Sequence, residues 1–171
     1  MRGGQQSRTP LIATWTVIAV IGCSLVSEPS VLAGHAFISY VREDSPRVDQ
    51  LKQTLEAAGI PVWRDTVSLW PGEDWRANIQ RAITDDALAF IACFSHSSLS
   101  RDKSYQNEEL VLAIDQLRLR RPDVPWLIPV RFDNCAIPGR DLGGGRTLAS
   151  IQSADLFRRS YRRRSCLSAI L

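Results

Sequence analysis

The stretch ALAFIACF, residues 87–94, decides the fold class of this chain. Eight consecutive apolar residues are what a strand carries when it is buried on both faces of a parallel sheet. Helical spacing of apolar residues occurs on both sides of this run, at Val48, Leu51, Leu55 and Ala58 before it and at Leu110, Ile114 and Leu117 after it. Strands that alternate with helices need right-handed crossovers, so the pattern predicts a parallel sheet.

The same alternation covers residues 34–157 and predicts a three-layer α/β domain. Further strands are expected at 36–41, 60–63 and 126–132, with a weak candidate near 150–156. Helices are expected to begin at Asp44 or Ser45, at Asp74 and at Ser104. Residues 95–103 are expected to form a polar loop, and Gly143, Gly144 and Gly145 a turn.

Charge is distributed unevenly along the 171 residues, although the net charge is only +3. Residues 158–164 hold five arginines, and residues 1–33 hold two arginines and one glutamate, so residues 34–157 have 14 basic and 17 acidic side chains. This acidic balance argues against a nucleic-acid partner. The four cysteines form no CxxC pair, so no metal site is expected.

The two ends of the chain differ from the domain between them. Residues 1–33 contain an uncharged run from Leu11 to Val26, which is shorter than the roughly 20 residues that span a bilayer. Three interpretations stay open: a signal peptide, a membrane anchor, or a stretch added by a mis-called start codon. The arginine-rich tail, residues 158–171, is expected to be a solvated or frameshifted end.

Four short motifs occur in order at the spacing of one domain. They are Phe37-Ile38-Ser39-Tyr40 with Arg42-Glu43-Asp44, Val62-Trp63-Arg64-Asp65, Leu69-Trp70-Pro71-Gly72, and Tyr105-Gln106-Asn107-Glu108-Glu109-Leu110. Together they resemble the TIR (Toll/interleukin-1 receptor) domain family, in its bacterial form. The first motif is similar to the family's box 1, the third to its BB loop, and the fourth to the motif that begins its helix C.

The resemblance implies a flavodoxin-like fold with a roughly five-stranded parallel sheet. It implies a role in signal transduction or bacterial immune defence, with two activities: cleavage of NAD at the nicotinamide–ribose bond, as substrate rather than cofactor, and homotypic assembly with other TIR domains. Assembly would use Leu69, Trp70, Pro71 and Gly72. Other family members are non-catalytic adaptors, so that alternative stays open. A cytoplasmic location is implied, with membrane attachment only through residues 11–26.

The resemblance places the catalytic carboxylate at Glu109, and helical geometry is consistent with that choice. At 100° per residue, Glu109 lies about 100° from the core-facing Leu110 and Glu108 about 160° from it. Glu109 therefore borders the buried face, whereas Glu108 faces solvent. A carboxylate there can stabilise the oxocarbenium ion that forms when the nicotinamide–ribose bond breaks. The alternative role for Glu109 is a first-turn acid that favours the helix dipole.

Ligands of open α/β sheets bind beyond the carboxyl ends of the strands, where Val41, Arg42, Trp70 and Tyr105 are expected to contact NAD. Arg42 suits the pyrophosphate, and its alternative is an ion pair with Glu43 or Asp44. Trp70 suits ring stacking or a neighbouring subunit, and its alternative is packing under its own loop. Tyr105 replaces the family's usual Trp, and Gln106 replaces its frequent Cys. His96 is expected to be solvated rather than a catalytic base.

Overall fold

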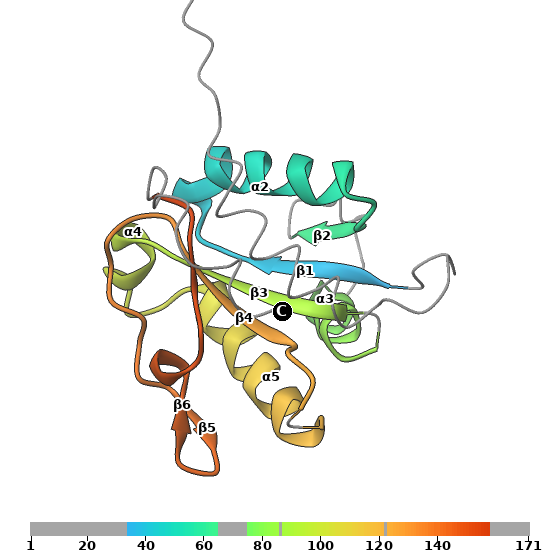
Figure 1. Cartoon of the computed structure of the whole chain (residues 1–171), viewed down its shortest axis with the longest axis vertical. Coiled ribbons are helices and arrows are strands. Elements are labelled where there is room, and N and C mark those ends of the chain that lie inside the picture. Colours follow the sequence, from blue (N-terminus) through green and yellow to red (C-terminus); the bar gives the residue numbers. More distant parts are fainter. Residues whose placement is uncertain (1–33, 65–74, 86, 122, 158–171) are drawn as a thin grey trace, which may run out of the picture.

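The computed structural model describes residues 34–64, 75–85, 87–121 and 123–157 (Figure 1). Its main sheet has five strands in the order β2-β1-β3-β4-β7, and every pairing is parallel. The strands are β1 (His35–Ser39), β2 (Val62–Arg64), β3 (Ala87–Phe94), β4 (Leu127–Arg131) and β7 (Ala154–Asp155). The predicted flavodoxin-like parallel sheet is confirmed, and the run that decided the fold class is its central strand.

Helices cover both faces of this sheet. Helix α2 (Ser45–Ala57) packs on one face, and α3 (Trp75–Thr84) and α5 (Tyr105–Leu119) pack on the other (Figure 1). Short helical turns, η1 (Arg42–Asp44) and α4 (His96–Leu99), follow the carboxyl ends of β1 and β3. A hairpin of β5 (Asp141–Gly143) and β6 (Arg146–Thr147) and the turn η2 (Leu148–Ser150) connect β4 to β7.

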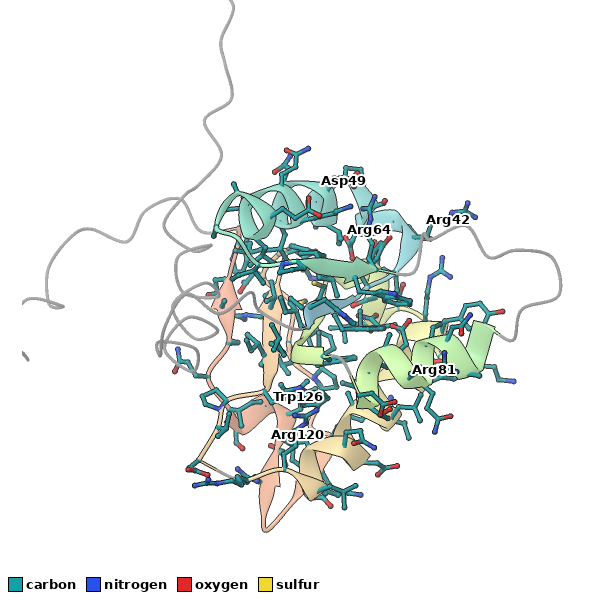
Figure 2. All side chains as sticks on the ribbon, turned by 90° about the vertical axis from the view of Figure 1, so that its right-hand side faces the viewer. Arg42, Asp49, Arg64, Arg81, Arg120 and Trp126 are labelled. Carbon is teal, nitrogen blue, oxygen red and sulfur yellow. The ribbon has the colours of Figure 1, made fainter. Side chains whose placement is uncertain are left out.

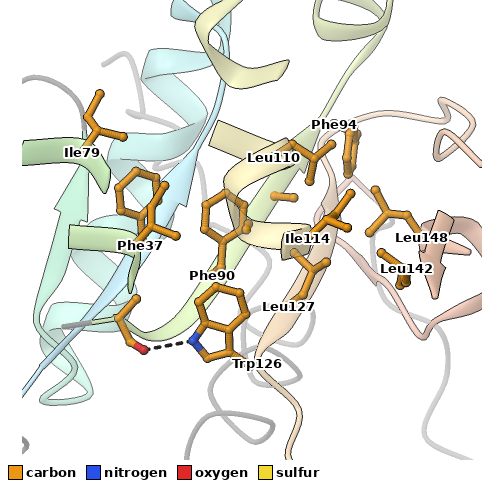
Figure 3. Packing of buried hydrophobic residues seen from close by; sticks show 14 of the residues in the cluster. Phe37, Ile79, Phe90, Phe94, Leu110, Ile114, Trp126, Leu127, Leu142 and Leu148 are labelled. Carbon is orange, nitrogen blue, oxygen red and sulfur yellow. Dashed lines mark hydrogen bonds between the residues drawn. The ribbon is translucent and has the colours of Figure 1, made fainter. Parts of the chain in front are cut away.

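The two faces of β3 explain its unbroken apolar sequence. Ala89, Ile91 and Cys93 belong to the core under α2, whereas Phe90, Ala92 and Phe94 belong to the core under α3 and α5. In the second core, the rings of Phe37 and Phe90 stack at 5.2 Å between centroids. Trp126 closes this core and donates its indole N–H to the carbonyl of Ala87 at 2.9 Å (Figure 3).

Helix α2 starts where it was expected, at Ser45. Asp44 occupies the N-cap position of α2, but its side chain makes no capping hydrogen bond. It accepts a hydrogen bond from the hydroxyl of Ser95 instead. The expected helix start at Asp44 or Ser45 is confirmed, and the Asp44 carboxylate binds a buried hydroxyl from the connection after β3 rather than a backbone N–H of α2.

The segment after β3 is also more ordered than the expected polar loop. Ser95 begins α4 with a capping box, in which its hydroxyl accepts from the backbone N–H of Ser98 and the Ser98 hydroxyl accepts from the backbone N–H of Ser95. Single-turn helices carry too few apolar positions to show periodicity, so the sequence pattern did not reveal this one.

The glycine turn lies where it was expected. Gly143, Gly144 and Gly145 have φ values of +88°, +63° and +73°, which L side chains rarely adopt. They join β5 to β6 in the hairpin.

Several predictions fall on residues outside the described ranges: the segments 1–33 and 158–171, the motif from Leu69 to Gly72, and the helix cap at Asp74. Within the described ranges, no helix is both long enough and apolar enough to cross a membrane.

Candidate functional site

The carboxyl ends of β1 and β3 lie side by side and meet the first turns of α5. Ser39, the last residue of β1, is level with Ala92 of β3. Helix α5 begins at Tyr105 and is capped by Ser104, whose hydroxyl accepts from the backbone N–H of Asn107 at 3.3 Å. The cap fixes where the helix starts, so its second turn faces the end of β1.

Glu109 is the buried carboxylate of this edge, with 5% of its surface exposed. The hydroxyl of Ser39 donates to its Oε2 at 2.5 Å. Its neighbour Glu108 is exposed, in agreement with the helical geometry.

Gln106 lies three residues before Glu109, on the same face of α5. Its side-chain amide donates to the carbonyl of Cys93 at 2.5 Å and to the carbonyl of Ser39 at 3.3 Å. Gln106, which replaces the family's frequent Cys, thus connects α5 to two strands. Sequence reasoning assigned it no role. The signals that could have found it are its helical spacing from Glu109 and the polar Ser39 at the end of an apolar strand.

The expected ligand-binding residues after β1 have opposite exposures. Val41 is buried, and its carbonyl accepts from the N–H of Asp44 at 2.9 Å. Arg42 is exposed, and Figure 2 shows its side chain extending away from the ribbon. Glu43 pairs with Arg101 instead, so among the described residues Arg42 takes part in no ion pair.

Tyr105 is the first residue of α5, and 60% of its surface is exposed. It precedes Glu109 by four residues and so shares its side of the helix. Trp70 lies outside the described ranges. The structure therefore gathers Val41, Arg42, Tyr105 and Glu109 around the carboxyl ends of the central strands.

A second polar cluster lies on the α2 side of the same sheet edge. The Ser95 hydroxyl donates to Oδ2 of Asp44 at 2.5 Å, and Asp44 is only 3% exposed. The guanidinium of Arg47 lies 3.5 Å from Asp44 and 3.6 Å from Asp133. Burial raises the pKa of the Asp44 carboxyl, although the Ser95 hydrogen bond and the charge of Arg47 lower it.

Asp133 joins His96 to this cluster. Its carboxylate accepts from the backbone N–H of His96 at 3.1 Å and lies 2.8 Å from the ring Nδ1. Burial raises the pKa of the Asp133 carboxyl. The hydrogen bonds from His96 and Cys135 and the nearby positive charges lower this pKa by more than burial raises it, so it lies below its usual value. The His96 side chain is 72% exposed, which agrees with the expected solvated position.

A sequence model of the TIR domain family matches residues 36–169, most of the chain. The chain belongs to the TIR domain family. No curated protein matches it.

Two solved structures show similar folds. The TIR domains of the activated Roq1 resistosome that directly recognizes the pathogen effector XopQ are 24% identical, with a TM-score of 0.48, and the match covers 58% of each chain. A metazoan TIR-STING receptor from C. gigas is 20% identical, with a TM-score of 0.47, and covers 63% of this chain and 34% of that one. This chain therefore spans only part of the length of each.

In this TIR domain, the first and fourth motifs meet in space. The first contributes Ser39 at the end of β1, and the fourth contributes Gln106 and Glu109 at the start of α5. The first motif also contributes Asp44, which contacts Ser95 on the other side of the sheet.

The two cysteines within the described ranges, Cys93 and Cys135, are buried. Burial raises the pKa of Cys93 well above its usual value. Burial and a hydrogen bond to Asp133 raise the pKa of Cys135 to about 11, so neither thiol is an effective nucleophile near neutral pH. Across the ranges described, no three His, Cys, Asp or Glu side chains are grouped to hold a metal ion.

Proposed function

We propose that this TIR domain is an NAD glycohydrolase that cleaves the nicotinamide–ribose bond, in signal transduction or bacterial immune defence. Glu109 carries the reaction. The observation that supports this role is a buried carboxylate, hydrogen-bonded by Ser39, at the sheet edge where α/β folds bind ligands.

The chemistry asks little of the protein beyond this carboxylate. Nicotinamide leaves as a neutral ring from a positively charged pyridinium, so no strong general acid is needed. The ribose left behind develops positive charge, and a fixed carboxylate beside it lowers the energy of that state. A water oxygen then bonds to the same ribose carbon and gives up a proton, which completes the hydrolysis. Burial strengthens the attraction because little water screens the two charges.

The remaining residues have binding roles in this proposal. Arg42, exposed and without an ion-pair partner among the described residues, takes the pyrophosphate. Tyr105 offers an exposed aromatic face one helical turn from Glu109, and Val41 and Trp70 complete the contacts.

Release of nicotinamide from NAD by the purified full chain tests the proposal. We expect Glu109→Gln to lower kcat by at least about a hundredfold, because it removes the charge that stabilises the transition state and keeps the shape. Glu108→Gln is the matched control on the adjacent, exposed position, and should retain the wild-type rate. No release at any protein concentration, or equal loss in the two variants, would contradict the proposal.

The second candidate is a non-catalytic module that assembles with other TIR domains through Leu69, Trp70, Pro71 and Gly72. The burial of Glu109 favours it, since a carboxylate bound to Ser39 also ties α5 to β1 as a purely structural contact. In that case Glu109→Gln lowers the melting temperature while wild type itself releases no nicotinamide.

Assembly and catalysis are coupled in our proposal, because a Leu–Trp pair bounded by Pro–Gly suits an interface. Specific activity should therefore rise with protein concentration. The Trp70→Ala variant should need about thirtyfold more protein than wild type to reach the same specific activity. An unchanged ratio of concentrated to dilute activity, together with a lower melting temperature, would show that Trp70 only packs.

A further inference from the structure

Ser39, the last residue of β1, has a buried hydroxyl. It is 1% exposed, and its neighbours along β1, Phe37 and Ile38, belong to the apolar cores. A hydroxyl buried in such surroundings costs free energy unless it is hydrogen-bonded. Ser39 meets this need by donating to Oε2 of Glu109 at 2.5 Å.

The bond has a consequence for the carboxylate as well as for the hydroxyl. A glutamate side chain turns about three bonds, and a catalytic group must be held within about 0.5 Å of its working position. The Ser39 hydroxyl fixes one oxygen of Glu109, which selects one orientation of the carboxylate plane. Misplacement by about 1 Å can lower a rate about a hundredfold.

The hydroxyl is itself held in place by α5. Gln106 donates to the carbonyl of Ser39 at 3.3 Å and to that of Cys93 at 2.5 Å. The backbone that carries the hydroxyl and the helix that carries the carboxylate are therefore fixed to each other through one amide. Ser39, Gln106 and Glu109 are all at most 6% exposed, so water competes little for these bonds.

We propose that Ser39 is a positioning residue: its hydroxyl, held through Gln106, orients the Glu109 carboxylate toward the ribose that develops positive charge. This inference rests on the NAD-cleaving function proposed above. It assigns no contact between Ser39 and the substrate.

The chain offers a matched control at Ser95. Its hydroxyl donates to Asp44 at the same distance, 2.5 Å, and both residues are equally well buried. The Ser95–Asp44 bond lies on the α2 side of the sheet edge and does not touch Glu109. Ser95→Ala therefore removes a hydroxyl–carboxylate bond of the same kind without disturbing the proposed catalytic group.

The test measures kcat and KM for NAD with the full chain and with Ser39→Ala, Ser39→Thr and Ser95→Ala, each corrected for the folded fraction. We expect Ser39→Ala to lower kcat about tenfold to a hundredfold and to leave KM within about threefold, because orientation is lost but binding is kept. Ser39→Thr retains the hydroxyl and should recover most of kcat. Ser95→Ala should retain kcat.

Two results would overturn the inference: an unchanged kcat in Ser39→Ala, or equal losses of kcat in Ser39→Ala and Ser95→Ala that follow their losses of stability. A second measurement separates this inference from the proposed function. The ¹³C carboxyl resonance of Glu109, assigned by its absence in Glu109→Gln, should shift in Ser39→Ala and stay in place in Ser95→Ala.

If the wild-type protein releases no nicotinamide, the Glu109 carboxyl resonance still tests whether Ser39 positions the carboxylate. That result alone rejects the NAD-cleaving function. A shifted resonance in Ser39→Ala then still supports the positioning of the carboxylate, and an unmoved resonance overturns it.

Discussion

Two hydroxyl–carboxylate pairs flank the same edge of the sheet, and they differ in what surrounds them. Ser39 binds Glu109 on the α5 side, and Ser95 binds Asp44 on the α2 side, both at 2.5 Å. The oxygen of Ser95 also accepts from the N–H of Ser98 and so caps α4. Helix α5 has a separate cap in Ser104, so Ser39 is not needed to start a helix.

The two pairs join different elements of the domain: the Ser39 pair joins β1 to α5, and the Ser95 pair joins the end of β3 to the start of α2. The Asp44 pair belongs to a network with Arg47, Asp133 and the first turn of α4, and several elements depend on it. The Ser39 bond acts on the orientation of Glu109. Similar distances and burial thus occur in two settings, one beside Gln106 and the other beside Arg47 and α4.

The largest expected effect breaks the structural pair. Asp44→Ala should lower the free energy of unfolding by about 3 kcal/mol, because it leaves the buried Ser95 hydroxyl without its acceptor. Asp44→Asn keeps an acceptor and removes a charge that burial disfavours, so it should cost less than half as much. Urea unfolding measures both values. Equal costs for Ala and Asn would show that the charge of Asp44, rather than its acceptor oxygen, stabilises the fold.

A smaller effect is expected on the pH dependence of the free energy of unfolding, because the pKa values of Asp44 and Asp133 are shifted in opposite directions. The folded-state pKa of Asp44 is raised, chiefly by burial, so its ionisation costs stability as the pH rises from the unfolded pKa, about 3.9, through the folded pKa. Relative to wild type, Asp44→Asn should therefore gain stability as the pH rises through this interval. Urea unfolding between about pH 3 and pH 7 measures the change.

Asp133 provides the control of opposite sign. Its folded-state pKa is lowered, so its ionisation stabilises the protein above the unfolded pKa, and this stability is lost as the pH falls through the folded pKa. Asp133→Asn should cost most near neutral pH and least in acid. The same pH trend in both variants would contradict the assigned shifts.

The smallest expected effect concerns Arg47. Its side chain is 50% exposed and lies 3.5 and 3.6 Å from its two carboxylates, so its ion pairs are largely screened. Arg47→Gln should cost less than about 1 kcal/mol, and the cost should shrink as salt is added. A cost that does not change with salt would mean that Arg47 acts through packing of its alkyl chain rather than through charge.

The sequence was most informative where apolar residues repeat regularly. The run from Ala87 to Phe94 predicted β3 with its correct bounds, and helical spacing predicted α5. Short elements were less predictable: α4 has four residues, and the second strand begins at Val62 rather than at residue 60. Such elements depend on contacts with distant segments, which periodicity does not record.

The candidate site was predictable only in part, for a related reason. Helical geometry distinguished buried Glu109 from exposed Glu108 because both lie on one long helix. The bonds from Ser39 to Glu109 and from Ser95 to Asp44 join residues 70 and 51 positions apart. These pairs could not be predicted from the sequence, because they depend on the parallel pairing that brings the ends of β1 and β3 together.

The amide of Gln106 has a consequence for the motions of the domain. Because it joins the first turn of α5 to the carbonyls of Ser39 and Cys93, at the ends of β1 and β3, fraying of that turn breaks both bonds. Helix ends ordinarily open through low-energy local fluctuations, and their amide hydrogens exchange with solvent rapidly. Here the beginning of α5 is joined to the central strands, so the amide hydrogens of its second turn, the first to have acceptors within the helix, should exchange more slowly than those of a helix end without such bonds, and Glu109, which lies in that turn, should share its restricted motion.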